Sequence, residues 1–248
     1  MKQITLGQYY PVDSILHTLD PRVKFVGTGL FLVSLFIFGN LAGLVVATLF
    51  LGTMIALSKV PFGYMVRGLK PVFILMVVTA LLNLLLTPGD SMFQLGPVNI
   101  TYRGVRSAGF LIIRLSYLVL GTSLMTLTTT PNRLTDGMES LLAPLNRIKV
   151  PVHEVAMMMS IALRFIPILV EETDKIRSAQ AARGVDFESG GILKRAKSYI
   201  PLLVPLFVSA FRRADELALA MESRCYRGGD GRTKMNPLVY RGRDFAAY

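Results

Sequence analysis

Residues 25–57 read FVGTGLFLVSLFIFGNLAGLVVATLFLGTMIAL and contain no charged residue. This run is too long for a single membrane crossing, which takes about 20 apolar residues. Gly39 and Asn40 form a turn dipeptide in its middle. The sequence therefore predicts a tight hairpin of two membrane helices, over about 22–38 and 41–58.

Two further apolar runs complete a transmembrane domain over residues 1–129. They cover about 70–87 and 106–129, with a Gly- and Pro-containing loop between them. Basic residues are concentrated before the first span and in the linker after the second: Lys2, Arg22, Lys24, Lys59, Arg67 and Lys70. Positive charge is retained on the cytoplasmic side, so the N-terminus and this linker are expected in the cytoplasm. Four crossings then return the chain there near residue 130.

The composition supports a membrane protein and argues against a nucleic-acid partner. Of the 248 residues, 52% are hydrophobic and 17% are charged, against about 25% charged in soluble domains. Residues 130–248 carry 18 of the 27 Lys and Arg residues and 13 of the 16 Asp and Glu residues. Basic residues kept on the cytoplasmic side explain the net charge of +11 without nucleic acid.

The residue types of catalytic and metal sites are scarce. Cys225 is the only cysteine, and His17 and His153 lack the spacing of a helical metal pair. The sequence has no glycine-rich phosphate loop. Arg114 is the charged residue well inside the apolar spans, and we expect it to reach an interface or to pair with a partner. The spans hold no paired carboxylates, so the sequence predicts no enzyme and no bound cofactor or metal.

Residues 130–228 are predicted to form three cytoplasmic helices, over about 131–143, 151–183 and 191–225. The two longer helices start apolar and become charged and rich in alanine. Residues 229–248 follow these helices as a predicted cytoplasmic linker.

The apolar parts of the two longer helices leave a second topology open. Residues 155–170 and 199–211 are shorter or more interrupted than a typical span, which favours packed or interfacial helices. As true fifth and sixth spans, they would instead place Arg183 outside the cell. Three prolines interrupt this region and are candidate hinges: Pro167, Pro201 and Pro205.

Both long helices end in an arginine tripeptide. The two tripeptides are Ala182-Arg183-Gly184 and Ser223-Arg224-Cys225. An arginine in a last helical turn can simply complement the helix dipole and bond free carbonyl groups. Its repetition favours a second interpretation, in which the two helix ends insert as equivalent plugs into two equivalent binding sites, or sockets, on partner proteins.

Apolar residues of the same helices form a candidate contact surface. They are Met157, Met158, Met159, Leu163, Leu203 and Phe207. Methionines can fill gaps in a helix bundle, or they can build an adaptable surface for more than one partner. Both interpretations stay open at this point.

Several strings in order resemble one family. They are Ser14-Ile-Leu-His17-Thr-Leu-Asp20-Pro21-Arg22-Val-Lys24, Thr129-Thr-Pro131, Arg164-Phe-Ile-Pro167 and the two arginine tripeptides. Together they resemble the T-component, or EcfT, of energy-coupling factor transporters, from the N-terminus to about Tyr240.

The resemblance implies an all-α fold of polytopic membrane helices, with four spans, a fifth beyond residue 248, and three cytoplasmic coupling helices. It implies a multi-pass protein of a prokaryotic cell membrane that moves a small substrate-binding S-component, which can be interchangeable, for uptake of vitamins or other micronutrients. Two ABC-type ATPases, identical or different, would use the ATP and Mg. The arginine tripeptides would dock into these ATPases, and the apolar surface would contact the S-component.

Two other classes of protein remain as alternatives. A conventional ABC importer permease would bind substrate within its own spans and would occur as two copies per ATPase pair. A polytopic membrane enzyme would need clustered Asp, Glu, His or Ser near a membrane face, and the sequence shows no convincing cluster.

Overall fold

The computed structural model describes residues 9–88, 91–95, 98–187, 189, 191–229, 235 and 237–247. The described chain is helical apart from one short antiparallel sheet, which confirms the predicted all-α class. It divides into two compact units. The bundle unit comprises the described residues of Gly7–Leu141 and Leu238–Tyr248, and the two-helix unit those of Leu142–Pro237.

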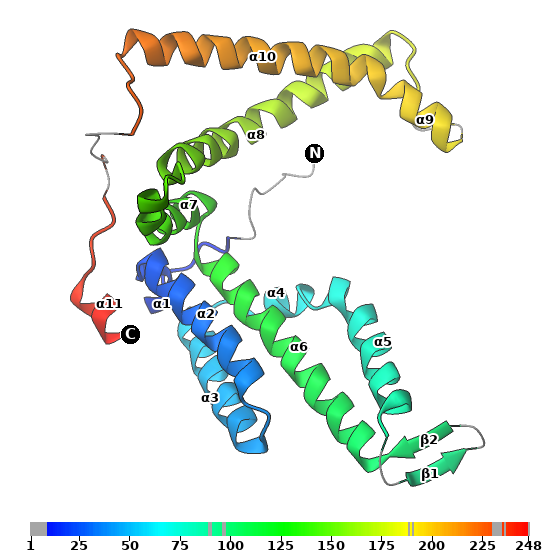
Figure 1. Ribbon diagram of the computed structural model, residues 1–248. Coiled ribbons are helices and arrows are strands. Elements are labelled where there is room, and N and C mark those ends of the chain that lie inside the picture. Colours follow the sequence, from blue (N-terminus) through cyan, green and yellow to red (C-terminus); the bar gives the residue numbers. More distant parts are fainter. Residues whose placement is uncertain are drawn as a thin grey trace. The chain divides into compact units, whose positions relative to one another are not determined.

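The bundle unit contains the predicted hairpin of residues 22–58 and its neighbours (Figure 1). Its helices are α1 (Ile15–Thr18), α2 (Pro21–Ile37), α3 (Leu41–Ser58), α4 (Phe62–Arg67), α5 (Lys70–Leu86), α6 (Tyr102–Thr128), α7 (Pro131–Leu142) and α11 (Gly242–Ala246). Strands β1 (Ser91–Leu95) and β2 (Val98–Thr101) lie between α5 and α6. The two-helix unit contains the 3-10 turn η1 (Ala143–Ile148), α8 (Val152–Ala182), α9 (Ile192–Ser198) and α10 (Ile200–Ser223).

A core of buried side chains joins α1, α2, α3 and α6. Its members include Leu16, Phe31, Leu35, Ala47, Leu51, Leu120, Leu124 and Leu127. Gly121 allows α6 to approach α2 closely, because a Cβ there would lie 2.9 Å from the Phe31 ring. Large apolar side chains elsewhere on these helices are exposed, among them Leu30, Phe36 and Leu49. An apolar exterior around an apolar core is the arrangement of a helical membrane protein.

The loop between the third and fourth apolar runs contains a hairpin that the sequence analysis did not predict. Strands β1 and β2 pair antiparallel, with Ser91 opposite Thr101 and an irregularity after Ser91. The Thr101 hydroxyl accepts the Gly104 N–H at 3.1 Å and donates to the Thr87 carbonyl at 2.8 Å. This cap starts α6 at Tyr102, ahead of the predicted residue 106.

Three described helices are long and apolar enough to cross a membrane: α3, α6 and α8. The α5 helix is also apolar but has 17 residues. For α8 this differs from the expectation that its apolar part is too short. The length and composition of α8 are therefore compatible with the alternative in which it is a fifth span.

Residues 131–141 and 238–247 belong to the bundle unit, whereas the sequence analysis grouped 130–228 together and treated 229–248 as a linker. Contacts with the start of α2 explain the difference. A Cβ at Gly137 of α7 would lie 3.0 Å from the Pro21 ring, and Asp244 bonds Asp20. These contacts pack both segments against the bundle.

The third predicted helix, over 191–225, is divided into α9 and α10 at Tyr199. Pro201 explains the division, because it has no N–H to donate to the Lys197 carbonyl and its ring crowds that carbonyl. In contrast, α8 continues through Pro167 without a break. Figure 1 shows α10 beginning beside the end of α8, and the two helices pack on each other.

Candidate functional site

The α8 helix ends in a complete Schellman motif built on the first arginine tripeptide. Arg183 is the C-cap, and Gly184 adopts a left-handed backbone with φ of 87°. The Gly184 N–H donates to the Ala181 carbonyl at 3.0 Å, and the Val185 N–H donates to the Gln180 carbonyl at 3.0 Å. These two bonds satisfy carbonyl groups that a helix end leaves free.

The α10 helix ends in the same motif, position for position. Arg224 is the C-cap, and Cys225 takes the left-handed position with φ of 55°. The Cys225 N–H donates to the Glu222 carbonyl at 2.8 Å, and the Tyr226 N–H donates to the Met221 carbonyl at 3.1 Å. The second tripeptide therefore has the same backbone geometry as the first, although its flanking residues differ.

Both arginine side chains are exposed and available to a partner. Within the described part of the chain, neither the Arg183 nor the Arg224 guanidinium forms a hydrogen bond or an ion pair. An exposed, permanently charged fork can bind acidic side chains or carbonyl groups on another protein. The structure thus presents the same chemical group twice, on the same type of helix end.

The two arginines lie at opposite ends of α10. Gln180, three residues before Arg183, contacts Pro201 in the first turn of α10. Arg224 follows the last residue of that helix, which has 24 residues and is therefore about 36 Å long. The separation is too large for both arginines to enter one narrow socket.

The segment after Arg183 is held by aromatic packing. Phe187 is 5% exposed, and the centre of its ring lies 5.7 Å from the centre of the Tyr199 ring. The Arg177 guanidinium lies 5.8 Å from the centre of the Phe187 ring. The Ser189 N–H donates to the Asp186 carboxylate at 3.1 Å. This packing fixes the direction in which the chain leaves the first arginine.

The residues of the predicted contact surface differ in their exposure. Met158, Met159, Leu203 and Phe207 are exposed, whereas Met157 and Leu163 are half-buried. Phe207 is 61% exposed and Met158 57%. The neighbouring Val204, Val208 and Phe211 of α10 are also exposed. The surface is therefore wider on α10 than the sequence analysis indicated.

The N-terminal string supports two helix starts. Ser14 caps α1, and its hydroxyl lies 2.7 Å from His17 Nδ1. His17 Nε2 lies 3.0 Å from the Tyr10 carbonyl oxygen. Because a carbonyl oxygen can only accept a hydrogen bond, Nε2 carries the proton. Burial lowers the pKa of His17 below its ordinary value of 6.5, and the Lys24 charge acts in the same direction.

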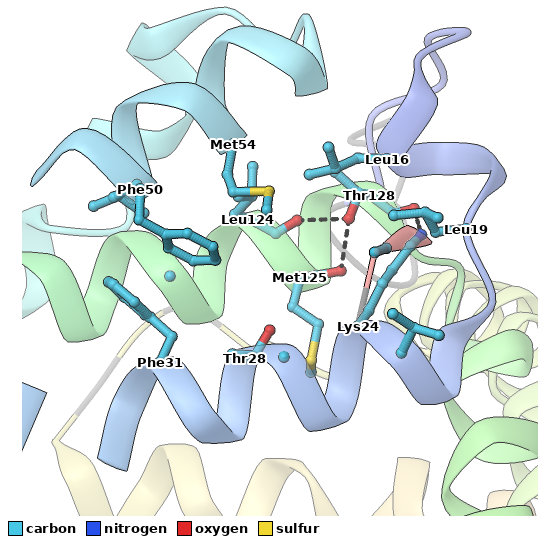
Figure 2. Close-up of a pocket in the computed structure, with 15 residues that line it drawn as sticks. Leu16, Leu19, Lys24, Thr28, Phe31, Phe50, Met54, Leu124, Met125 and Thr128 are labelled. Carbon is cyan, nitrogen blue, oxygen red and sulfur yellow. Dashed lines mark hydrogen bonds between the residues drawn. The ribbon is translucent and has the colours of Figure 1, made fainter. Parts of the chain in front are cut away.

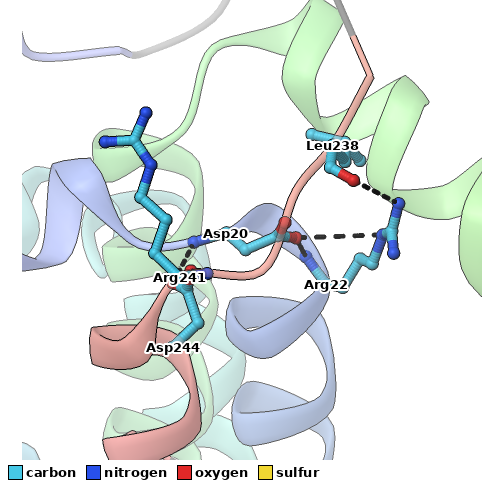
Figure 3. A network of polar contacts seen from close by, with 5 residues as sticks. All are labelled: Asp20, Arg22, Leu238, Arg241 and Asp244. Atoms are coloured by element: carbon cyan, nitrogen blue, oxygen red, sulfur yellow. Dashed lines mark hydrogen bonds and ion pairs between the residues drawn. The ribbon is translucent and has the colours of Figure 1, made fainter.

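The same string holds the segment that follows Pro237 (Figure 3). The Asp20 carboxylate accepts the Arg22 N–H at 2.9 Å and thereby caps α2. The Asp20 N–H donates to Asp244 Oδ1 at 2.9 Å, and the Arg241 N–H donates to Asp244 Oδ2 at 2.7 Å. Arg22 donates to the Leu238 carbonyl at 3.4 Å. We call this group the Asp20–Asp244 clamp.

A pocket lies between α2, α3 and α6 (Figure 2). Phe31 and Phe50 lie at one end of it, and Lys24 and Thr128 lie at the other. Lys24 Nζ donates to the Thr128 carbonyl at 2.9 Å and to Thr129 Oγ1 at 3.1 Å. With its ammonium engaged in this way and its other walls largely apolar, the pocket lacks the convergent polar groups typical of a polar ligand site.

Arg114 binds the α2–α3 hairpin at the turn between its two helices. Its Nη2 donates to the carbonyl of Phe38, the C-cap residue of α2, at 3.3 Å. A cation at a helix C-terminus complements the helix dipole. The pairing that the sequence analysis left open is therefore made within this chain.

The described residues contain no group of three or more His, Cys, Asp or Glu side chains that could hold a metal ion. Multiple apolar helices, an apolar exterior and paired arginine helix ends define a polytopic all-α membrane protein. Two comparisons with known proteins identify its family.

The family model described as Cobalt transport protein, CbiQ, matches residues 13–235. Proteins named Energy-coupling factor transporter transmembrane protein EcfT match almost the whole chain. The protein of Thermosediminibacter oceani is 53% identical over 248 residues, covering 100% of this chain and 94% of its own length. That of Heliobacterium modesticaldum is 54% identical over 246 residues, covering 99% and 92%. That of Bacillus subtilis is 50% identical over 245 residues, covering 98% and 92%.

The chain therefore belongs to the EcfT family, the transmembrane T-components of energy-coupling factor transporters. This confirms the family that the ordered strings indicated.

Proposed function

We propose that this chain is the non-catalytic scaffold that couples two ABC-type ATPases to a small S-component in a bacterial micronutrient importer. The observation that carries the proposal is the repeated Schellman end with an exposed arginine C-cap, at Arg183 and Arg224. One chain thereby offers two equivalent plugs on separated helix ends. Two ATPase subunits offer two equivalent sockets.

The partners supply the chemistry that the chain lacks. The ATPases bind and hydrolyse ATP with Mg, and the scaffold binds no cofactor of its own. Closure of the ATPase pair carries the arginine ends with it, and the movement passes along α8 and α10. The exposed surface that includes Met158, Leu203 and Phe207 contacts the S-component, with Met157, Met159 and Leu163 at its margins. Pro167, Pro201 and Pro205 are the positions at which these helices would bend during that movement.

The proposal requires a cytoplasmic location for both arginine ends and for the N-terminus. Attachment of a membrane-impermeant thiol reagent to Asp186→Cys, in a Cys225→Ser background, tests it in intact cells. We expect labelling only after the cells are opened. Labelling in sealed cells would place α8 across the membrane and would contradict docking to ATPases.

The docking role is tested by Arg183→Ala combined with Arg224→Ala. Loss of one member of a desolvated interface pair costs about 2–5 kcal/mol, so we expect the ATPases to be lost from the purified complex and uptake to fail. Membrane insertion should be unchanged. The matched control combines Arg195→Ala with Arg212→Ala, two exposed arginines outside the two tripeptides. Full complex yield and transport in the Arg183/Arg224 variant would refute the role.

A further inference from the structure

Proline leaves a carbonyl group of α10 without its helical donor. In a regular helix the N–H of residue 205 would donate to the carbonyl of residue 201. Pro205 has no N–H, so that bond is missing. The structure shows Gln180 Nε2 of α8 donating to the Pro201 carbonyl at 3.3 Å. A side chain of one long helix therefore replaces the donor that the other helix lacks.

Gln180 serves the end of its own helix at the same time. Its backbone carbonyl accepts the Val185 N–H at 3.0 Å, which closes the Schellman motif around Arg183. The same residue thus joins the arginine C-cap to the first turn of α10. Leu203, two residues beyond the acceptor, is exposed.

A second polar link joins the two helices farther along. Arg213 Nη2 lies 3.0 Å from Glu172 Oε2, with 34% and 28% of the two side chains exposed. An ion pair with this exposure contributes about 0–1 kcal/mol and is easily broken. The bond to the Pro201 carbonyl is different, because its loss leaves an acceptor that the helix itself has no N–H to satisfy.

We infer that Gln180 is a positioning residue that transmits movement from the Arg183 end to α10. The inference rests on the proposed function. Displacement of Arg183 by an ATPase is passed through the Gln180 amide to the Pro201 carbonyl, and hence to the surface around Leu203 and Phe207.

The test compares two substitutions of Gln180 in the complete complex with its ATPases and S-component. Gln180→Met keeps the length and the apolar stem but has no donor, whereas Gln180→Lys keeps a donor of sufficient reach. We expect Gln180→Met to lower substrate uptake per ATP hydrolysed about two- to tenfold, the range for loss of one hydrogen bond. ATPase copurification should be unchanged. Gln180→Lys should retain most of the coupling.

Pro205→Ala separates positioning from simple stabilisation. It restores an N–H for the Pro201 carbonyl, so Gln180→Met with Pro205→Ala should have the melting temperature of Pro205→Ala alone. A carbonyl oxygen can accept two N–H groups, so Gln180 still reaches Pro201 in Pro205→Ala. The double variant lacks this α8 donor and should stay uncoupled relative to Pro205→Ala. This variant also provides a folded protein if Gln180→Met alone does not accumulate.

Equal uptake per ATP in Pro205→Ala with and without Gln180→Met would overturn the inference. So would a loss of coupling in Gln180→Lys as large as that in Gln180→Met. Failure of this inference leaves the Arg183/Arg224 variant unable to hold ATPases. Failure of the proposed function instead appears as normal ATPase binding in that variant, so the two failures are distinguishable.

Discussion

At the scale of single residues, the two helix ends differ mainly in what occupies the left-handed position. Gly184 adopts a positive φ without steric cost, whereas Cys225 places a Cβ in a conformation that L-residues avoid. Among the described residues, apart from its own chain neighbours, no heavy atom lies within 4 Å of a Cβ built on Gly184. The energetic difference between the two positions is therefore one of backbone conformation.

This difference predicts opposite effects for two exchanges. Cys225→Gly should stabilise the end of α10 by about 0.5–1 kcal/mol, and Gly184→Ala should destabilise the end of α8 by about 1 kcal/mol. Hydrogen exchange of the amides at residues 225–226 and 184–185 measures each local change. Slower exchange in Gly184→Ala than in the parent protein would contradict the assigned strain.

His17 gives the N-terminal segment a pH dependence. Burial lowers its pKa in the folded protein below 6.5, so folding favours the neutral imidazole. The stabilisation is complete above pH 6.5 and is lost as the pH falls through the lower folded-state pKa. We expect hydrogen exchange in residues 10–18 to accelerate between pH 7 and pH 5, after correction for intrinsic rates. In His17→Gln this extra acceleration should be absent; if it persists, another group is responsible.

At the scale of elements, the Asp20–Asp244 clamp fastens α11 to the start of α2. Asp244 is 2% exposed and accepts two backbone N–H groups, from Asp20 and from Arg241. Removal of a carboxylate from buried donors is costly because the donors remain desolvated. The clamp joins positions separated by 224 residues in the chain.

Asp244→Ala should therefore release the segment around α11. We expect a local loss of about 2–3 kcal/mol, which corresponds to about 30- to 150-fold faster exchange of the Asp20 and Arg241 amides. Asp244→Asn retains one carbonyl acceptor and should show a smaller increase. Equal protection in all three proteins would show that the clamp does not stabilise this segment.

The elements differ in how well the sequence predicts them. A turn dipeptide and a helix cap mark both ends of α2 locally, so its bounds, Pro21–Ile37, lie within a residue of the predicted range. The β1–β2 hairpin is short and was missed. The sequence offers two prolines, Pro201 and Pro205, at which the predicted helix could be divided. Only Pro201 coincides with a division, at Tyr199, and tertiary contacts decide between them. The Asp20–Asp244 clamp has no local pattern, because the Asp20 N–H and the Asp244 carboxylate meet only after folding.

At the scale of the whole molecule, one chain carries two matched arginine ends. The sequence analysis identified both tripeptides, although the residues that flank the second arginine differ from those that flank the first. Only the backbone shows that Cys225 occupies the position of Gly184. The hydrogen bond from Gln180 to Pro201 could not be predicted from the sequence either. It depends on the donor missing at Pro205 and on the packing of two separate helices.

Photo-crosslinking from both helix ends tests the central claim most directly. A benzophenone amino acid replaces Ala182 and Ser223, which are exposed and leave both arginines in place. The doubly substituted chain is assembled with its ATPases, irradiated, and analysed by mass. The account predicts one scaffold chain joined to two ATPase subunits, with either single substitution joined to one. Capture of only one ATPase by the double variant, or of none, would contradict a scaffold that serves both subunits.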